Sequence, residues 1–239
     1  MHGSSFASGD HGILLWVAVN NDDNGTIQIR RSDNHGQDWF WAGTPPGART
    51  AGTPGLAWTR VGNQSTWILV WANFDRNNQN DTGKIRASLS TDNGNTWSAP
   101  VTLNAYSKAL SGVSVAASAS NEIVVAFAFA GQQVAGMNNI HTLRCQVNAG
   151  QLQLLSYVGT LERTRIQPAL VYDVNRGNFI MAWREQNYNT TLATMRAAWG
   201  TLTWSTKVNL LGTASNVAPS LAAVAEYGEH VLWYAFEGP

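Results

Sequence analysis

The feature of this sequence that most constrains its fold is an internal repeat of short apolar runs, spaced by roughly 50 to 58 residues. Each run follows a turn that contains glycine, asparagine or aspartate, and a second strand-like segment lies upstream of it. β-Branched and aromatic residues alternate with small or polar ones, and helical periodicity is absent, so the repeats predict an all-β fold. The runs cover residues 13–19, 67–72, 123–129, 179–183 and 231–236.

Four of the five repeats continue with two more strand-like segments, which makes four strands per repeat. The third segments lie at 27–29, 85–87, 143–145 and 195–197, and the fourth at 39–42, 97–101, 152–157 and 204–208. Repeats of this length and composition are typical of β-propeller blades. We therefore expect one domain, 1–239, folded as a β-propeller of about five four-stranded blade repeats with the last incomplete. The approximate repeat boundaries are 1–49, 50–107, 108–163, 164–213 and 214–239.

The incomplete fifth repeat leaves three arrangements open. The ring could have five blades with a thin last blade, or the chain could be a segment of a larger propeller with six or seven blades. In the third arrangement two chains complete one another through their open blade edges, because an unpaired strand edge favours pairing.

Two repeats carry the same turn motif between their third and fourth strands. Residues 90–97 read Ser-Thr-Asp-Asn-Gly-Asn-Thr-Trp, and residues 32–39 read Ser-Asp-Asn-His-Gly-Gln-Asp-Trp. The Asp or Asn two residues after the serine can accept hydrogen bonds from turn amides, and the glycine can take positive φ without steric cost. The tryptophan can then cover the turn and bury a large apolar surface. We interpret these residues as structural.

This motif resembles the Asp-box, or bacterial neuraminidase repeat, S-x-D-x-G-x-T-W, which caps an outer hairpin of propeller blades in sialidases and their non-catalytic relatives. The copy at 90–97 is nearly complete, whereas the other has Asn34 in the Asp position and Asp38 in the Thr position. At 147–150 and 200–204 a turn remains without the serine and aspartate. The resemblance implies a sialidase-like propeller.

Sialidases of that family are expected to carry an arginine triad, a tyrosine nucleophile activated by glutamate, an aspartate acid/base and an F/Y-R-I-P signature. The nearest sequence here is Arg165-Ile166-Gln167-Pro168, which has an extra residue and lies in the fourth repeat. The carboxylates next to tyrosines are Glu185 with Tyr188 and Glu237 with Tyr234. We assign no catalytic residue, and a sialidase-like exo-glycosidase, or a fragment of one, is the alternative to a binding protein.

Candidate ligand-binding residues come from the third strands, from the second strands and from the loops that follow the second strands. The arginines of the third strands share one register in our alignment, so they could bind a sugar or a carboxylate, or instead form polar ladders between blades. Tryptophans can stack on a pyranose or fill the core. The candidates are Arg86, Arg144, Arg196, Trp71, Asn73, Asp75, Trp183, Arg184 and Glu185.

We expect neither a metal nor a cofactor. Asp22, Asp23, Asp75 and Asp81 match no known calcium loop. The lone Cys145 is expected to be a buried small hydrophobe rather than a reactive thiol.

Charged residues make up only 13% of the chain, and its net charge is zero, so a nucleic-acid partner is not expected. No apolar run is long enough for membrane insertion. Many uncharged polar residues suit an extracellular or cell-surface protein. We predict a non-catalytic propeller that binds a carbohydrate or glycoconjugate through inter-blade or rim pockets. The other alternative is a structural or protein-interaction propeller within a larger secreted assembly.

Overall fold

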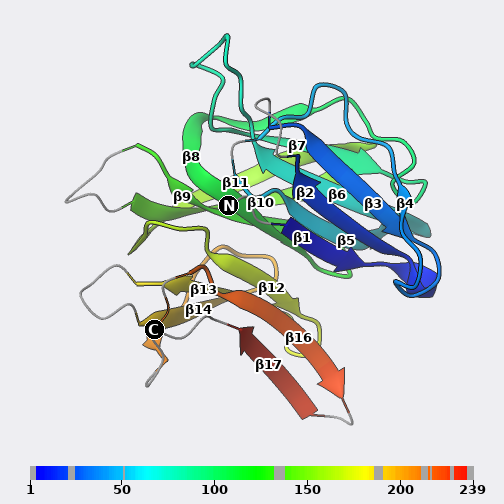
Figure 1. Ribbon diagram of the computed structural model, residues 1–239. Coiled ribbons are helices and arrows are strands. Elements are labelled where there is room, and N and C mark those ends of the chain that lie inside the picture. The colour runs from blue at the N-terminus through cyan, green and yellow to red at the C-terminus, as the bar shows by residue number, and fades with distance from the viewer. Residues whose placement is uncertain are drawn as a thin grey trace.

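The computed structural model describes residues 4–20, 25–50, 52–131, 138–185, 191–210, 215, 217–226 and 229–235 (Figure 1). Within these ranges the chain consists of strands β1 to β17 and one 3-10 turn, η1 (Asp10–Gly12). Among the same residues, no helix has the length and apolar character needed to cross a membrane. The predicted all-β fold is confirmed.

The strands form antiparallel sheets in which neighbours in sequence are neighbours in space. The first sheet contains β1 (Ser4–Ser8), β2 (Leu14–Val19), β3 (Ile27–Ser32) and β4 (Phe40–Trp41). The largest contains β5 (Gly55–Val61), β6 (Gln64–Ala72), β7 (Lys84–Ser90), β8 (Val101–Ala117), β9 (Glu122–Phe129), β10 (Asn138–Asn148) and β11 (Gln151–Thr164). The third contains β12 (Ala169–Asp173), β13 (Asn178–Arg184), β14 (Leu192–Ala198) and β15 (Val208–Asn209), and the last contains β16 (Ser220–Glu226) and β17 (Glu229–Ala235).

Strand β8 joins two repeats that the sequence suggested were separate sheets. Its first half, from Val101 to Lys108, pairs with β7, and its second half, from Ala109 to Ala117, pairs with β9. A single seven-stranded sheet results, with irregular pairing where β8 passes from one partner to the other. We call β1–β4 unit 1, β5 to the first half of β8 unit 2, the second half of β8 to β11 unit 3, β12–β15 unit 4 and β16–β17 unit 5.

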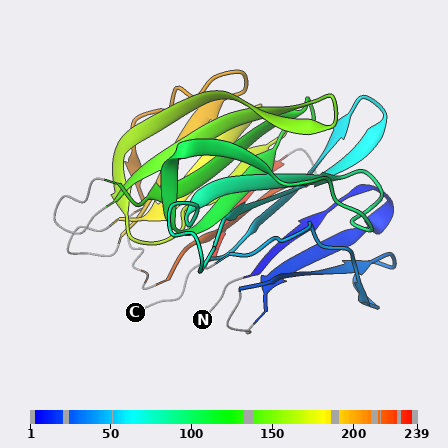
Figure 2. The ribbon, with the colours of Figure 1, turned by 90° about the horizontal axis from the view of Figure 1, so that it is seen from above.

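The core lies between successive units rather than within one layer. Apolar side chains of units 1 and 2 form one cluster, those of units 2 and 3 a second, and those of units 3 and 4 a third. The units follow one another around the molecule, from blue through green and yellow to red (Figure 1), and in the view from above unit 1 (blue) lies on the opposite side from the orange strands of unit 4 (Figure 2). Because each cluster needs residues from two units, a unit is stabilised by its neighbours.

The turn at 90–97 has the hydrogen bonds that its sequence predicts. Asp92 accepts hydrogen bonds from the Thr96 amide (2.9 Å), the Thr96 hydroxyl (2.6 Å) and the Ser90 hydroxyl (2.8 Å). Burial raises the pKa of Asp92, but these hydrogen bonds outweigh burial and the net pKa is lowered. Gly94 has φ +83°, and the Trp97 indole donates to its carbonyl at 3.1 Å. The turn is thus a self-contained staple between β7 and β8.

The copy at 32–39 repeats this geometry with an amide in place of the carboxylate. The Asp38 amide donates to Asn34 Oδ1 (2.9 Å), and the Trp39 indole donates to the Gly36 carbonyl (3.1 Å). Trp39, however, stays 38% exposed, so the expectation that the motif tryptophan is buried is wrong for this copy, and Trp97 of the other copy is partly buried. Trp97 packs against the apolar cluster between units 1 and 2. Trp39 lies outside the apolar clusters that the described residues form.

Candidate functional site

A cavity of about 590 Å³ lies where the first strands of all five units meet. Strands β1, β5, β8, β12 and β16 each contribute side chains to its wall. Its position follows from the repeat, because every unit begins with the strand nearest the common centre. Polar side chains in the wall include Ser5, Thr53, Ser114, Gln167 and Ser220.

Hydrogen bonds across the cavity wall tie neighbouring units together. The Gln167 amide nitrogen donates to the Val113 carbonyl (2.8 Å) and to the Ser114 hydroxyl oxygen (3.0 Å). The Ser114 hydroxyl donates in turn to the Pro168 carbonyl (2.5 Å). The side-chain carbonyl of Gln167 receives no hydrogen bond from a described residue, which leaves one acceptor for a ligand.

Backbone segments of neighbouring units approach one another closely around this cavity. A Cβ atom added to Gly112 would lie 2.3 Å from Gln167 Oε1 and 2.6 Å from the Thr53 carbonyl oxygen. A Cβ on Gly55 would lie 2.9 Å from the Val113 carbonyl oxygen. Glycine is therefore required at both positions for the first strands to approach one another.

The described wall of the cavity is electrically neutral. Its side chains are aliphatic, aromatic, hydroxyl or amide groups, and none of the described lining residues is Asp, Glu, His, Lys or Arg. Such a wall can exchange hydrogen bonds with a polar ligand and pack against its apolar faces. It supplies neither a general acid nor a cation for a carboxylate.

The two tryptophans predicted to bind ligand are core residues. Trp71 and Trp183 are fully buried, and neither indole nitrogen has a hydrogen-bond partner in the described structure. They occupy matching places, since Trp71 packs between units 1 and 2 and Trp183 between units 3 and 4. Both lie out of reach of a ligand.

The expected common register of the three arginines is wrong for Arg86. Arg144 and Arg196 pair with Val124 and Ile180, each the third residue of its second strand. Arg86 instead pairs with Trp71, near the other end of β6. The turn lengths differ between units, so counting residues between motifs misaligned this strand.

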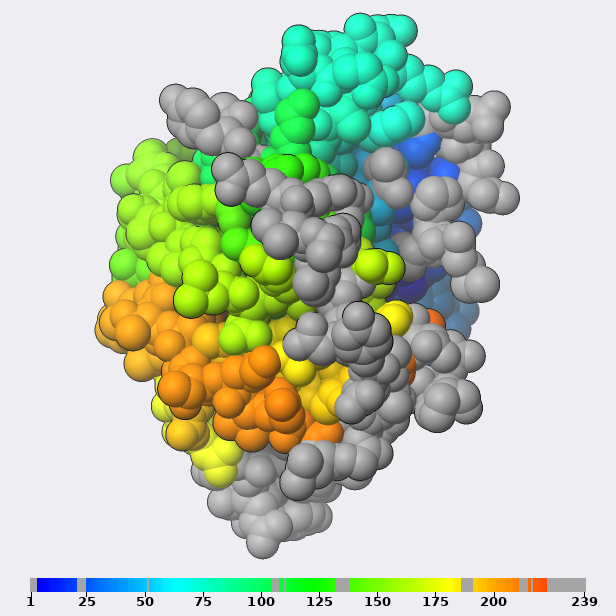
Figure 3. All heavy atoms as spheres, turned by 90° about the vertical axis from the view of Figure 1, so that its left-hand side faces the viewer, coloured from blue at the N-terminus to red at the C-terminus, as the bar shows by residue number. Residues whose placement is uncertain are grey.

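Arg144 holds Glu122 in place, and Glu122 joins two units. Its Nε donates to Glu122 Oε1 at 2.6 Å, and Glu122 Oε2 accepts the Gly200 amide at 2.8 Å. Glu122 is only 4% exposed, and the turn at Gly200 belongs to unit 4. The surfaces of these two units adjoin in Figure 3, where the light green of unit 3 meets the orange of unit 4.

Arg86, Asn73 and Asp75 organise the loop after β6. Asp81 accepts hydrogen bonds from Arg86 (2.6 Å) and from the Asn73 side chain (2.6 Å), and Lys84 lies 3.0 Å away. Burial raises the pKa of Asp81. The hydrogen bonds and charges of Lys84 and Arg86 lower it by more, so the net pKa lies below its ordinary value. Asp75 accepts the amides of the two residues after Arg76. These contacts are internal to one loop.

Glu185 forms an ion pair with Lys207, which also lies 3.3 Å from Glu162 of unit 3. The hydrogen bond from Lys207 to Glu185 raises the pKa of this lysine. Arg184, just before it, is half-buried. Tyr188 and Glu237 lie outside the described residues, as do Asp22 and Asp23, and the Tyr234 side chain is likewise not described. Arg165 is exposed and does not line the central cavity.

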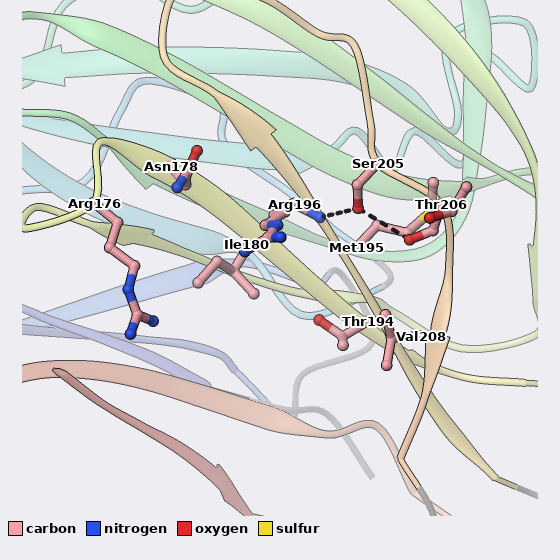
Figure 4. A pocket seen from close by; sticks show the side chains of 9 residues that line it. All are labelled: Arg176, Asn178, Ile180, Thr194, Met195, Arg196, Ser205, Thr206 and Val208. Atoms are coloured by element: carbon pink, nitrogen blue, oxygen red, sulfur yellow. Dashed lines mark hydrogen bonds between the residues drawn. The ribbon is translucent and has the colours of Figure 1, made fainter.

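Arg196 lines a second pocket, of about 310 Å³, on the outer strands of unit 4 (Figure 4). Ile180, Thr194 and Val208 share its wall, and Ser205 binds the Arg196 backbone amide at 3.2 Å. All of its described lining residues belong to unit 4, so it is not one of the predicted pockets between units, and it contains one of the nine candidate residues.

Cys145 is fully buried in the cluster between units 2 and 3, as predicted, and burial raises its pKa to about 12. The central cavity itself was not predicted. Its signal was present in the recurrent strand openings, since the residues around Pro54, Pro168 and Pro219 begin the strands that line it.

No protein-family model matches this sequence, and a search of curated proteins finds no match. Among solved structures, the chain is similar to a protein of unknown function from Dyadobacter fermentans, with TM-score 0.62, 13% identity and coverage of 92% of this chain and 71% of that one. It is also similar to an α-L-arabinanase from Penicillium chrysogenum complexed with arabinobiose, with TM-score 0.68, 14% identity and coverage of 98% and 74%.

A mutant of the NanB sialidase from Streptococcus pneumoniae gives TM-score 0.64 at 10% identity, and the match covers 97% of this chain and 55% of that one. The chain thus spans about half the length of this sialidase. At such identities the likeness concerns the fold alone. This chain has a sialidase-like β-propeller fold.

Proposed function

We propose that this protein is a non-catalytic Asp-box propeller that binds a neutral glycan in its central cavity. The observation that carries this proposal is the neutral wall of that cavity, which combines hydroxyl and amide groups with aliphatic and aromatic ones. Its volume of about 590 Å³ lies within the usual range for small-ligand sites.

The neutral wall argues against glycoside hydrolysis in this cavity. Glycosidases generally place a pair of carboxyl groups on either side of the scissile bond. Two carboxylates of the described structure, Glu122 and Glu185, form ion pairs with Arg144 and Lys207 and do not line the cavity. A general acid with a raised pKa has no counterpart among the described lining residues. Binding without bond cleavage is the chemistry that this wall supports.

The wall also selects the kind of glycan. Sugar hydroxyls can bond to the free carbonyl of Gln167 and to the hydroxyl of Ser220, while the C–H faces of a sugar ring pack against Phe6 and Leu56. Sialic acid carries a carboxylate, and no described cation lines the cavity to pair with it. We therefore favour a neutral sugar, presented at a cell surface or in the extracellular space.

The test is binding to an array of neutral and sialylated glycans, followed by calorimetric titration of the best neutral hit. Ser220→Trp should weaken binding at least tenfold, because it fills the cavity and removes no hydrogen bond between units. Gln167→Leu should also weaken binding, although it removes two hydrogen bonds between units as well. Gln153→Leu, an exposed change on β11, is the matched control. Thermal unfolding of each variant separates lost binding from lost fold.

Two results would contradict the proposal. One is release of nitrophenol from an aryl arabinoside or sialoside by the wild type, abolished by Ser220→Trp. The other is array binding that is restricted to sialylated glycans.

A further inference from the structure

The outermost strand of unit 3 is far longer than those of units 1 and 4. Strand β11 has 14 residues and pairs with β10 along one edge, and none of the described residues pairs with its other edge. Strands β4 and β15, the outermost strands of units 1 and 4, have 2 residues each. In unit 2 the outermost strand is the first half of β8, which ends at Lys108. A very short edge strand or an edge lysine discourages pairing with another chain, and β11 has neither protection.

This open edge belongs to a unit whose four strands are all described. The second half of β8 and strands β9, β10 and β11 form unit 3, in the middle of the chain. Figure 2 shows β11, in yellow-green, along the outer border of the molecule. The edge is therefore the outer end of a complete unit, and it presents a row of unpaired backbone N–H and C=O groups.

Most of this edge is electrically neutral. Residues 151–161 include no charged residue and no proline, although proteins commonly place such residues on an exposed edge because they discourage pairing. The two charged residues of the strand, Glu162 and Arg163, lie at its end. Glu162 forms an ion pair with Lys207, and Arg163 donates a hydrogen bond to Asn139. We call residues 151–161 the neutral edge.

The neutral edge also carries exposed apolar side chains. Leu154, Leu155, Tyr157 and Leu161 are between 38% and 93% exposed. Leu155 and Leu161 have no partner residue on β10, because they lie where the pairing of β10 with β11 shifts register. Apolar surface beside an open backbone edge favours contact with another polypeptide.

Tyr157 is held in one orientation near the middle of the neutral edge. Its hydroxyl shares a hydrogen bond with Nδ1 of His141, and the two rings meet edge to face with their centres 5.1 Å apart. The His141 ring in turn stacks on Phe129, at 4.2 Å between ring centres. A tyrosine fixed in this way loses little conformational entropy when it enters an interface, and tyrosine is common among the residues that anchor interfaces.

We propose that β11 pairs with β11 of a second copy of this chain, so that the protein forms a two-fold symmetric dimer. A two-fold axis perpendicular to the sheet makes a strand run antiparallel to its own copy, which is the geometry of an antiparallel ladder. Ser156 is the midpoint of the neutral edge. An axis near Ser156 therefore places every residue of the neutral edge opposite another residue of the neutral edge.

This register also suits the charges. Glu162 and Arg163 of the two copies lie at opposite ends of the paired strands, so like charges stay apart. A second copy supplies an edge of the same length, the same neutrality and the same apolar content. A charged strand of another protein would place its charges against an edge that offers no counter-charge.

The contact lies away from the central cavity. No residue of β11 is among the residues that line that cavity, so both copies of the dimer keep it accessible. The contact also differs from the completion of the fifth repeat by a second chain, because it uses unit 3 only. The dimer does not depend on the glycan proposal and can be tested without a glycan.

Sedimentation equilibrium of the full chain tests the dimer. The mass should rise with protein concentration to twice 25.9 kDa. Leu155→Lys and Leu161→Lys each place a charge on the neutral edge at an exposed side chain, and each should raise the Kd of the dimer at least tenfold. Val174→Lys is the matched control, because it adds the same charge at an exposed aliphatic residue of unit 4 and should leave the Kd unchanged.

A cysteine near the proposed axis tests the register. Directly opposed residues of an antiparallel pair have Cβ atoms about 4.5–5.5 Å apart, so Ser156→Cys should form a disulfide between copies under mild oxidation. Ser120→Cys, an exposed change in the turn between β8 and β9, should not. Cys145 is fully buried and does not compete. Amide hydrogen exchange of residues 151–161 should slow in the dimer, while exchange of residues 229–235 should not change.

Three results would overturn the proposal. One is a monomer, or an aggregate without a defined mass, at every concentration. Another is a dimer whose Kd neither lysine variant changes. The third is a dimer in which residues 229–235 are protected in place of residues 151–161, or in which Ser156→Cys cross-links no better than Ser120→Cys.

Discussion

The contact between Arg144 and Glu122 provides the sharpest test of whether the third-strand arginines serve structure or ligand binding. Glu122 is 4% exposed and accepts hydrogen bonds from Arg144 at 2.6 Å and from the Gly200 amide at 2.8 Å. Replacing it with alanine leaves the arginine unpaired and frees an amide of the next unit. We expect Glu122→Ala to lower the free energy of unfolding.

The magnitude follows from the burial of the two partners. Removing one member of a fully buried ion pair costs about 3–5 kcal/mol. The Arg144 side chain is 26% exposed and can regain some hydration, so we take the lower end, about 3 kcal/mol. For a chain of this length, about 3 kcal/mol lowers the melting temperature by about 6–12 °C.

The assay is urea and thermal unfolding of Glu122→Ala, Arg144→Ala and the double variant. Because the two side chains share one hydrogen bond, the double variant should lose less than the sum of the single variants, by about 1 kcal/mol or more. Ligand affinity of Arg144→Ala, measured below its melting temperature, should match the wild type. Additive losses, or unchanged stability with lost ligand binding, would refute a structural role for Arg144.

Three further perturbations test other parts of the fold. Burial lowers the pKa of His141 to about 4, so unfolding takes up a proton between about pH 6.5 and 4. The free energy of unfolding therefore falls as pH drops through that window, by up to about 1.4 kcal/mol per pH unit. His141→Phe should flatten this pH profile in urea titrations. Gly94→Ala should cost about 1–2 kcal/mol in thermal unfolding for its positive φ, and more for the approach of a Cβ to Leu15 at 3.0 Å. Gly150→Ala, at φ +74° with no atom within 4 Å, isolates the backbone cost. Trp183→Phe should cost below about 1.5 kcal/mol because it removes an unpaired buried N–H, whereas Trp183→Ala should cost about 3–5 kcal/mol in urea unfolding.

The strands and turns of this protein could be predicted from sequence because their signals are local. Alternation of apolar and polar residues marks a strand, and serine, aspartate and glycine at fixed offsets mark the turn at 90–97. Cys145 was assigned correctly for the same reason, since it sits in an apolar strand pattern. The merger of units 2 and 3 through β8 was not predictable, because it depends on which partner each half of one long strand meets.

The binding residues were harder to predict from sequence than the strands and turns. Of the nine residues chosen from sequence, Trp71 and Trp183 are buried in the core, Arg144 and Glu185 form ion pairs that link or brace units, and Arg196 lines a pocket. Chemical type alone does not distinguish an arginine that fixes a structural carboxylate from one that faces a ligand. The distinction requires knowing where the neighbouring carboxylate lies.

The sequence by itself determined the repeat, the four-strand unit and the turn chemistry, because these depend on residues a few positions apart. The tertiary structure alone decided which faces are buried between units and which stay open. Leu69 and Trp16 occupy matching places on the second strands of units 2 and 1, but Leu69 is core and Trp16 is partly exposed. Unit 2 packs against unit 1 on that side, whereas none of the described residues forms an apolar cluster on the same side of unit 1. Burial is a property of the neighbour as much as of the residue, and the neighbours here are about fifty residues away or more in the chain.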